Sequence, residues 1–157
     1  MKILNLLALK GPNVWSRRTV LEAWVDLEDL RDRPSNELPG LYERLSDWLP
    51  GLIEHRCGIG ERGGFLMRLR DGTYAGHILE HVTIELQNLA GTPVGFGKAR
   101  ETSTPGTYKV AFRYREEAVG RAAFAAAQEL LAAAIADRPY DLPTTVARLK
   151  ELADDVR

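Results

Sequence analysis

Residues 74–90, YAGHILEHVTIELQNLA, contain the pattern that decides the fold. Apolar residues recur at helical spacing along one side of this stretch, namely Ile78, Leu79, Val82, Leu86 and Leu89. Thr73 stands where an N-cap residue is expected, and Gly91 and Pro93 follow the last turn, as they commonly do after a helix. The pattern therefore predicts a long helix that is anchored by its apolar side and presents its polar side.

Strand patterns occur on both sides of this helix in the sequence. The apolar run 2–9, which stops at Gly11-Pro12-Asn13, predicts a buried strand, and the alternation over 20–28 predicts a second one. Residues 94–102 and 107–115 flank the turn-forming Ser103-Thr104-Pro105-Gly106 and predict a hairpin. Periodicity and turn residues assign the remainder: helices over 40–53 (interrupted at Pro50), 116–137 and from 142 onward, loops at 29–39 and 55–64, and either a helix or a strand at 65–71.

The composition is that of one globular domain. The chain has 157 residues, of which 45% are hydrophobic and 27% charged, so disordered and fibrous classes are excluded. The strands group at the start and in the middle, with helices between them. The order predicts a single α+β domain over residues 1–157, with mainly antiparallel strands packed against the long helix and the C-terminal helices.

Charge and hydropathy narrow the class of partner and the location. The net charge of −1 argues against a protein that binds nucleic acid by bulk charge. The richest apolar stretch, 122–136, is interrupted by Gln128 and Glu129, so we expect no membrane span. The N-terminus lacks the cleavage site of a signal peptide, and a cytoplasmic location is the expectation.

The predicted helix carries the motif H-x-x-E-H as His77, Glu80 and His81. Residues four apart on a helix lie one turn apart on the same side, so the two imidazoles can converge on one cation. Two histidine nitrogens suit zinc, and Glu80 is placed to act on an attacking water. The order of the motif is that of inverzincins. The competing interpretation is an ordinary solvated face with hydrogen bonds between neighbouring turns.

A zinc site needs a third protein ligand, and the sequence offers several. The chain has three histidines and one cysteine, so we expect the ligands to be histidines and carboxylates and Cys57 to be a buried, small apolar residue. Glu85, four residues after His81, is the first candidate. His55, Glu54 and Glu101 are the alternatives.

Four long blocks resemble the N-terminal domain of the cyanophycin synthetase family. They are LNLLALKGPNVWS (4–16), RPSNELPGLYERL (33–45), RGGFLMRLRDGTYAGHILEHVTIELQNLAG (62–91) and PVGFGKARETSTPGTYKVAFRYREE (93–117). Cyanophycin is a poly-aspartate with arginine on each β-carboxyl group. In the family this domain precedes an ATP-grasp ligase and a Mur-ligase-like module, so the resemblance implies that the steps requiring ATP and Mg²⁺ take place outside these 157 residues.

The resemblance implies two roles for the domain. One is to bind the growing polymer. The other, in members that keep H-x-x-E-H, is a zinc metallopeptidase-like cleavage of the backbone that makes primers. Carried onto this chain, it implies zinc on His77, His81 and Glu85, with Glu80 as the catalytic group. Arg62 and Arg100 are then the expected partners of polymer carboxylates, and Glu101 of an arginine side chain. The alternatives are a non-catalytic tether and a domain that organises a synthetase homo-oligomer.

Overall fold

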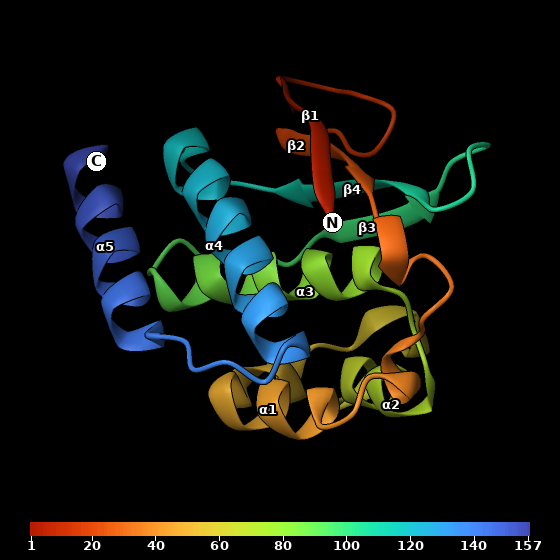
Figure 1. The fold of residues 1–157 in the computed structure, drawn as a ribbon. Coiled ribbons are helices and arrows are strands. Elements are labelled where there is room, and N and C mark those ends of the chain that lie inside the picture. Colours follow the sequence, from red (N-terminus) through yellow and green to blue (C-terminus); the bar gives the residue numbers. More distant parts are fainter.

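A computed structural model describes residues 1–157 and contains one four-stranded sheet (Figure 1). The strands are β1 (Lys2–Leu9), β2 (Val20–Asp26), β3 (Gly97–Glu101) and β4 (Thr107–Arg113), in the spatial order β1-β2-β4-β3. All neighbouring pairs are antiparallel. The predicted second strand and the predicted hairpin are confirmed, the latter with Gly97 opposite Phe112 and Glu101 opposite Tyr108.

Strand β1 is an edge strand and is largely exposed, which corrects the prediction that residues 2–9 are buried. The side chains of Leu4 and Leu7 are 50% and 43% exposed. β1 pairs only with β2. Its apolar run correctly predicts a strand, but such a run does not show whether other elements cover the strand. The core residues lie instead on the inner face of β2 and β4, where Leu21, Val110 and Phe112 are fully buried.

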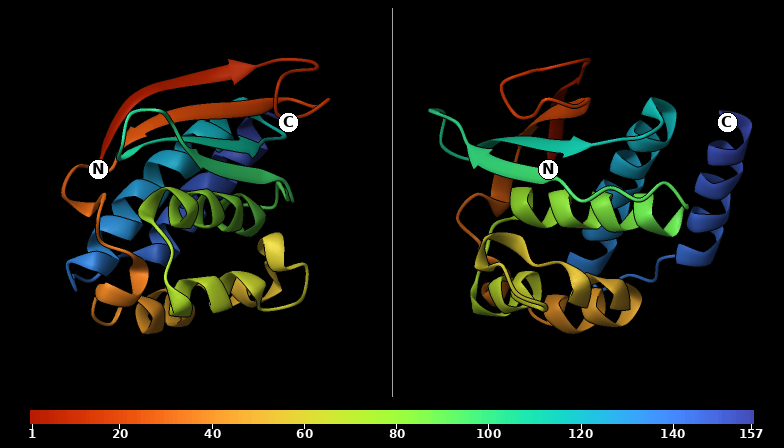
Figure 2. Two further views of the ribbon diagram at one scale, coloured as in Figure 1. Left: turned by 90° about the vertical axis from the view of Figure 1, so that its right-hand side faces the viewer. Right: turned by 180° about the vertical axis from the view of Figure 1, so that it is seen from behind.

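Helix α3 (Ala75–Leu89) is the predicted long helix, and it runs beneath β3 and β4 through the middle of the molecule (Figures 1 and 2). Of its predicted apolar side only Leu89, in the last turn near the surface, is exposed. The predicted cap is wrong: Tyr74 occupies the N-cap position without a side-chain bond, and Thr73 forms a hydrogen bond to the ring of His77 instead.

The other helices complete a core of 32 buried residues that all layers share, so the α+β class is confirmed. Helices α1 and α2 form a layer on the far side of α3 from the sheet, and α4 and α5 pack beside it (Figure 1). The segment predicted as one helix over 40–53 ends at Trp48, before Pro50, and residues 65–71 are helical. The bounds are α1 Leu41–Trp48, α2 Gly64–Asp71, α4 Glu117–Ile135 and α5 Leu142–Asp155, with short 3-10 helices η1 Glu28–Leu30, η2 Ser35–Glu37, η3 Pro50–Glu54 and η4 Cys57–Ile59.

Helix α4 is the one helix with the length and hydropathy of a membrane span, and half of that window is buried inside the protein. Its Phe124 stacks on Phe112 of β4, with ring centroids 5.4 Å apart. The apolar residues of α4 thus serve the core between the sheet and α3.

The start of α2 is packed too tightly for any side chain at Gly64. A Cβ atom there would overlap the backbone carbonyl of Arg56 and lie 3.2 Å from the Cβ of Ile59. We expect Gly64→Ala to lower the free energy of unfolding by about 1–3 kcal/mol or more, because the segment that carries Cys57 must shift. Urea unfolding measures the effect.

Gly58→Ala is the matched control for this substitution, since a Cβ atom at Gly58 meets nothing within 4 Å. Equal stabilities for the two variants would contradict the packing argument at Gly64.

Candidate metal centre

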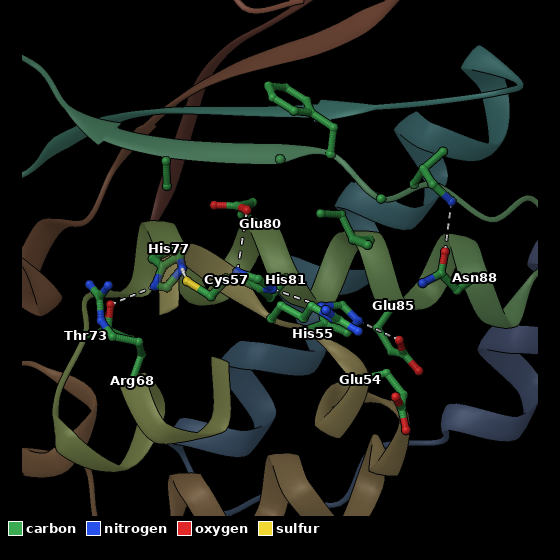
Figure 3. Close-up of a pocket in the computed structure, with 18 of the residues that line it drawn as sticks. Glu54, His55, Cys57, Arg68, Thr73, His77, Glu80, His81, Glu85 and Asn88 are labelled. Carbon is green, nitrogen blue, oxygen red and sulfur yellow. Dashed lines mark hydrogen bonds and ion pairs between the residues drawn. The ribbon is translucent and has the colours of Figure 1, made fainter. Parts of the chain in front are cut away.

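A cavity of about 840 Å³ lies between α3, the segment 51–58 and the start of β3. The side chains of the H-x-x-E-H motif line it, together with residues from η3, η4, α2 and β4 (Figure 3). The histidines point toward η3 and η4, whereas Glu80 points toward β3 (Figure 3). The motif therefore faces two different walls of one cavity.

Three potential metal ligands converge in this cavity, from Cys57, His77 and His81. Their donor atoms lie within 4.8 Å of one another, and Cys57 Sγ is 3.1 Å from His77 Nε2. Tetrahedral zinc, with bonds of about 2.0–2.3 Å, holds its ligand atoms ~3.3–3.8 Å apart. One thiolate and two imidazoles are also a donor set that zinc prefers. These three residues therefore fit a zinc ion, which they would hold through one sulfur and two nitrogen atoms.

Cys57 corrects two predictions made from the sequence. It is half-buried and hydrogen-bonded to His77, so it is not an inert apolar residue, and it adds sulfur to a donor set expected to contain only histidines and carboxylates. Its backbone has φ = 56°, a conformation that costs a non-glycine residue of order 1–3 kcal/mol. The turn through Cys57, Gly58 and Gly60 aims the sulfur at α3.

Each histidine of the motif has one ring nitrogen bonded elsewhere. Thr73 Oγ1 lies 2.9 Å from Nδ1 of His77, and His55 Nδ1 lies 2.9 Å from Nδ1 of His81. Phe65 stacks on the ring of His81 at a centroid distance of 4.1 Å and meets His77 edge-on. Both rings are thus fixed in orientation, and Nε2 is the nitrogen of each that a metal could use, that of His77 lying 3.1 Å from Cys57 Sγ.

Glu80 and His81 are buried and His77 is half-buried, although the sequence predicted that the helix presents the motif on its polar side. Glu80 and His81 are 4% and 5% exposed, because η3, η4 and β3 cover this side of α3. Burial lowers the pKa of His77 to about 4, with a smaller contribution from the charge of Arg68. Burial, and then the neighbouring His77, His55 and Arg68, lower the pKa of His81 well below its ordinary range. Both imidazoles are therefore neutral at pH 7, the state that binds a metal.

Glu80 lies against β3 at a position where only a glycine leaves room. A Cβ atom on Gly97 would lie 2.6 Å from Cγ and 2.7 Å from Oε1 of Glu80. The carboxyl oxygen Oε1 is 3.6 Å from His81 Nε2, so it borders the converging donor atoms without being one of them. Burial raises the pKa of Glu80 to about 8.

The structure separates the four candidates for a third ligand. Glu85 and His55 line the cavity but bind each other, with Glu85 Oε2 2.8 Å from His55 Nε2, and neither belongs to the converging group. Glu54 lines the cavity at its exposed rim and pairs with Arg62 at 2.8 Å. Glu101 is on β3, outside the cavity, and accepts a hydrogen bond from the backbone of Gly106.

None of the three expected substrate contacts lines the cavity. Arg62 is exposed and bound to Glu54. Arg100 and Glu101 lie on β3 beside a smaller hollow of about 250 Å³, and the Arg100 guanidinium is 5.5 Å from the ring centroid of Trp15. The charged side chain that does line the main cavity from α2 is Arg68.

The sequence pattern did not predict that Cys57, His55 and Thr73 contact the histidines of the motif. The signals were present but weak: a lone cysteine and a lone histidine two residues apart in a glycine-rich connection, and a threonine four residues before His77. Periodicity does not predict which residues of such a connection will contact a later helix. Only the packing of η3 and η4 on α3 brings the groups together.

Comparison with known proteins agrees with the resemblance noted above. Residues 22–136 match the family described as cyanophycin synthase-like N-terminal domain. The chain is 51% identical to cyanophycin synthetases of Crocosphaera subtropica and of a Synechocystis species over 156 residues, and 49% identical to that of Geminocystis herdmanii. Each alignment covers 98% of this chain and 18% of the relative, so the chain spans about a fifth of their length. The chain therefore belongs to the family of cyanophycin synthase-like N-terminal domains.

Proposed function

We propose that this domain binds cyanophycin and cuts its poly-aspartate backbone as a zinc-dependent hydrolase, producing short chains that prime polymerisation. The observation that carries the proposal is the convergence of Cys57, His77 and His81 beside the carboxyl group of Glu80 in one cavity. Such an arrangement would join a metal ion to a general acid–base group, a combination that hydrolyses amides.

Zinc bound there would supply Lewis-acid activation of the scissile carbonyl and of the attacking water. The protein's own part falls to Glu80, which would take a proton from the water and return it to the leaving amine. Glu80 Oε1 is close to the donor atoms but is not one of them, as this role requires. Thr73, Phe65 and His55 hold the two imidazoles so that the geometry persists between turnovers.

Glu80 would also change its protonation state if a divalent cation were bound beside it. Burial alone raises its pKa to about 8, so in the metal-free protein the group holds its proton at neutral pH. An opposite charge a few ångströms away favours the ionised form and lowers the pKa. Zinc binding would thus convert Glu80 into the base that the reaction needs.

The walls of the cavity suit a polymer with both signs of charge. Arg68 lines the cavity from α2, and its charge reaches far enough to lower the pKa of His77. A guanidinium of this kind would hold a carboxylate of the polymer. Arg62, Arg100 and Glu101 lie outside the cavity, and we propose that they contact more distant repeats of a long chain.

Digestion of cyanophycin by the purified domain tests this function. With one equivalent of zinc we expect shortened chains that carry new amino termini, measured by mass spectrometry. A chelator is expected to stop the reaction, and added zinc to restore it. Zinc-loaded protein that leaves the polymer intact would overturn the proposal.

The outer face of the sheet favours a second candidate function, that of a non-catalytic tether. Trp15 and Trp24 both donate their indole N–H to the carboxylate of Glu22, at 2.5 and 3.0 Å, and Lys109 lies 4.5 Å from the Trp24 ring centroid. With Arg100 over Trp15, the face offers rigid aromatic rings and cations to a charged polymer. Retention on cyanophycin without cleavage by the zinc-loaded chain would favour this function.

The matched relatives are named cyanophycin synthetases, and this chain covers 18% of their length, which supports a role within a larger protein. We propose that it works with ATP-grasp and Mur-ligase-like modules, which would use ATP and Mg²⁺, in a cytoplasmic homo-oligomer. The ligase steps would belong to those modules.

A further inference from the structure

His55 forms a bridge between the metal centre and a buried carboxylate. One ring nitrogen, Nδ1, is 2.9 Å from Nδ1 of His81, and the other, Nε2, is 2.8 Å from Oε2 of Glu85. The side chains of His55 and Glu85 are each 7% exposed, so water competes little for these bonds. His55 follows the last turn of η3, and Glu85 lies one turn after His81 on α3.

The chemistry of the three groups fixes where the protons lie. A carboxylate only accepts hydrogen bonds, so Nε2 of His55 must carry a proton and donate it to Glu85. In a neutral ring the other nitrogen, Nδ1, is then an acceptor, and it must receive its hydrogen bond from Nδ1–H of His81. The lone pair of His81 is left on Nε2, the nitrogen beside Glu80. The reverse pattern would put a proton on Nε2 and block metal binding there.

The surrounding residues keep this row of groups aligned. Gly51 on η3 lies so close to Glu85 that a Cβ atom would overlap its Oε1 oxygen. Phe65 packs on both imidazoles, with centroid distances of 6.4 Å to His55 and 4.1 Å to His81. The bridge is therefore held by packing from η3 on one side and α2 on the other.

We propose that Glu85 and His55 are positioning residues that hold His81 in its Nδ1–H tautomer and so prepare Nε2 for the metal. The proposal rests on the proposed function only in taking His81 as a ligand. Glu85 then acts on His81 through two hydrogen bonds and not as a metal ligand. Partners that orient a ligating histidine in this way typically contribute 10–100-fold to metal affinity.

The tautomers of the metal-free protein provide the first test. Two-bond ¹⁵N–¹H correlation spectra distinguish a ring protonated at Nδ1 from one protonated at Nε2. In the wild type we expect His81 to be the Nδ1–H form and His55 the Nε2–H form. An Nε2–H tautomer for His81 would overturn the proposal, and this measurement needs no variant.

Titration with Co²⁺, followed by its visible absorption and its cysteine charge-transfer band, provides the second test. We expect His55→Ala to bind Co²⁺ about 10–100-fold more weakly than the wild type. His55→Asn should recover much of the affinity, because its amide oxygen can replace Nδ1 as the acceptor for His81. Glu43→Gln, which alters an exposed carboxylate on α1, is the control and should bind Co²⁺ unchanged.

The outcomes separate this proposal from the proposed function. Wild-type affinity in His55→Ala would overturn the positioning role while leaving hydrolysis intact. A wild-type domain that has the expected tautomers and binds Co²⁺, but never cuts cyanophycin, would support the positioning role and remove the hydrolase.

Discussion

Glu80→Gln protein is expected to bind one zinc ion as the wild type does and to cut cyanophycin 10²–10⁴-fold more slowly, the usual contribution of a general acid–base group. Glutamine has nearly the shape of glutamate, so it fits the space that Gly97 leaves. It cannot accept a proton from water or return one to the leaving amine. Cys57, His77 and His81 are untouched, so the metal site should remain. Zinc analysis and a cleavage time course measure the two properties separately.

The matched control is Glu43→Gln, the same substitution at an exposed position on α1. We expect it to cut at the wild-type rate. If zinc-loaded Glu80→Gln protein cuts as fast as this control, Glu80 does not transfer the proton, and the proposed mechanism fails whatever the composition of the metal site.

The long helix and its motif were predictable because both depend on local periodicity. A spacing of four residues places His77 and His81 on one side of any helix, whatever surrounds it. The apolar side of α3 was recognisable for the same reason, and so was the alternation of β4. Each of these features is determined by residues that are close to it in the sequence.

The burial of the motif was not predictable from periodicity. A polar helix face usually faces water, but here η3 and η4 fold back over it, and β3 closes the other side. The same return of the chain places Cys57 and His55 against residues that follow them by 20 or more positions. The third potential ligand is therefore Cys57, which lies in a connection without periodicity. Glu85, which is near the motif in the sequence, binds His55 instead.

The stability of the metal-free protein should depend on Glu80 at high pH and on His77 at low pH. Glu80→Gln is expected to remove only the dependence at high pH. The pKa of Glu80 is about 8 in the folded state against 4.5 for the unperturbed group. Below about pH 4.5 Glu80 is protonated in both the folded and the unfolded protein, so its raised pKa does not lower the stability there. As the pH rises toward 8 the unfolded chain releases the proton first, and the folded state loses stability relative to it. A full shift of this size corresponds to roughly 5 kcal/mol.

Glu80→Gln removes that loss, so its advantage in stability over the wild type should be small at pH 5 and grow to several kcal/mol at pH 8. His77 acts in the opposite sense: its folded pKa of about 4 lies below the ordinary 6.5, so its stabilising contribution is present above 6.5 and is lost as the pH falls toward 4. The wild type and Glu80→Gln should both lose this contribution to stability at low pH. Urea unfolding of chelator-treated samples at pH 5, 6.5 and 8 measures the difference, with Glu43→Gln as the control. A difference that stays constant across this range would mean that Glu80 is ionised in the folded, metal-free protein, and that zinc is not needed to make it a base.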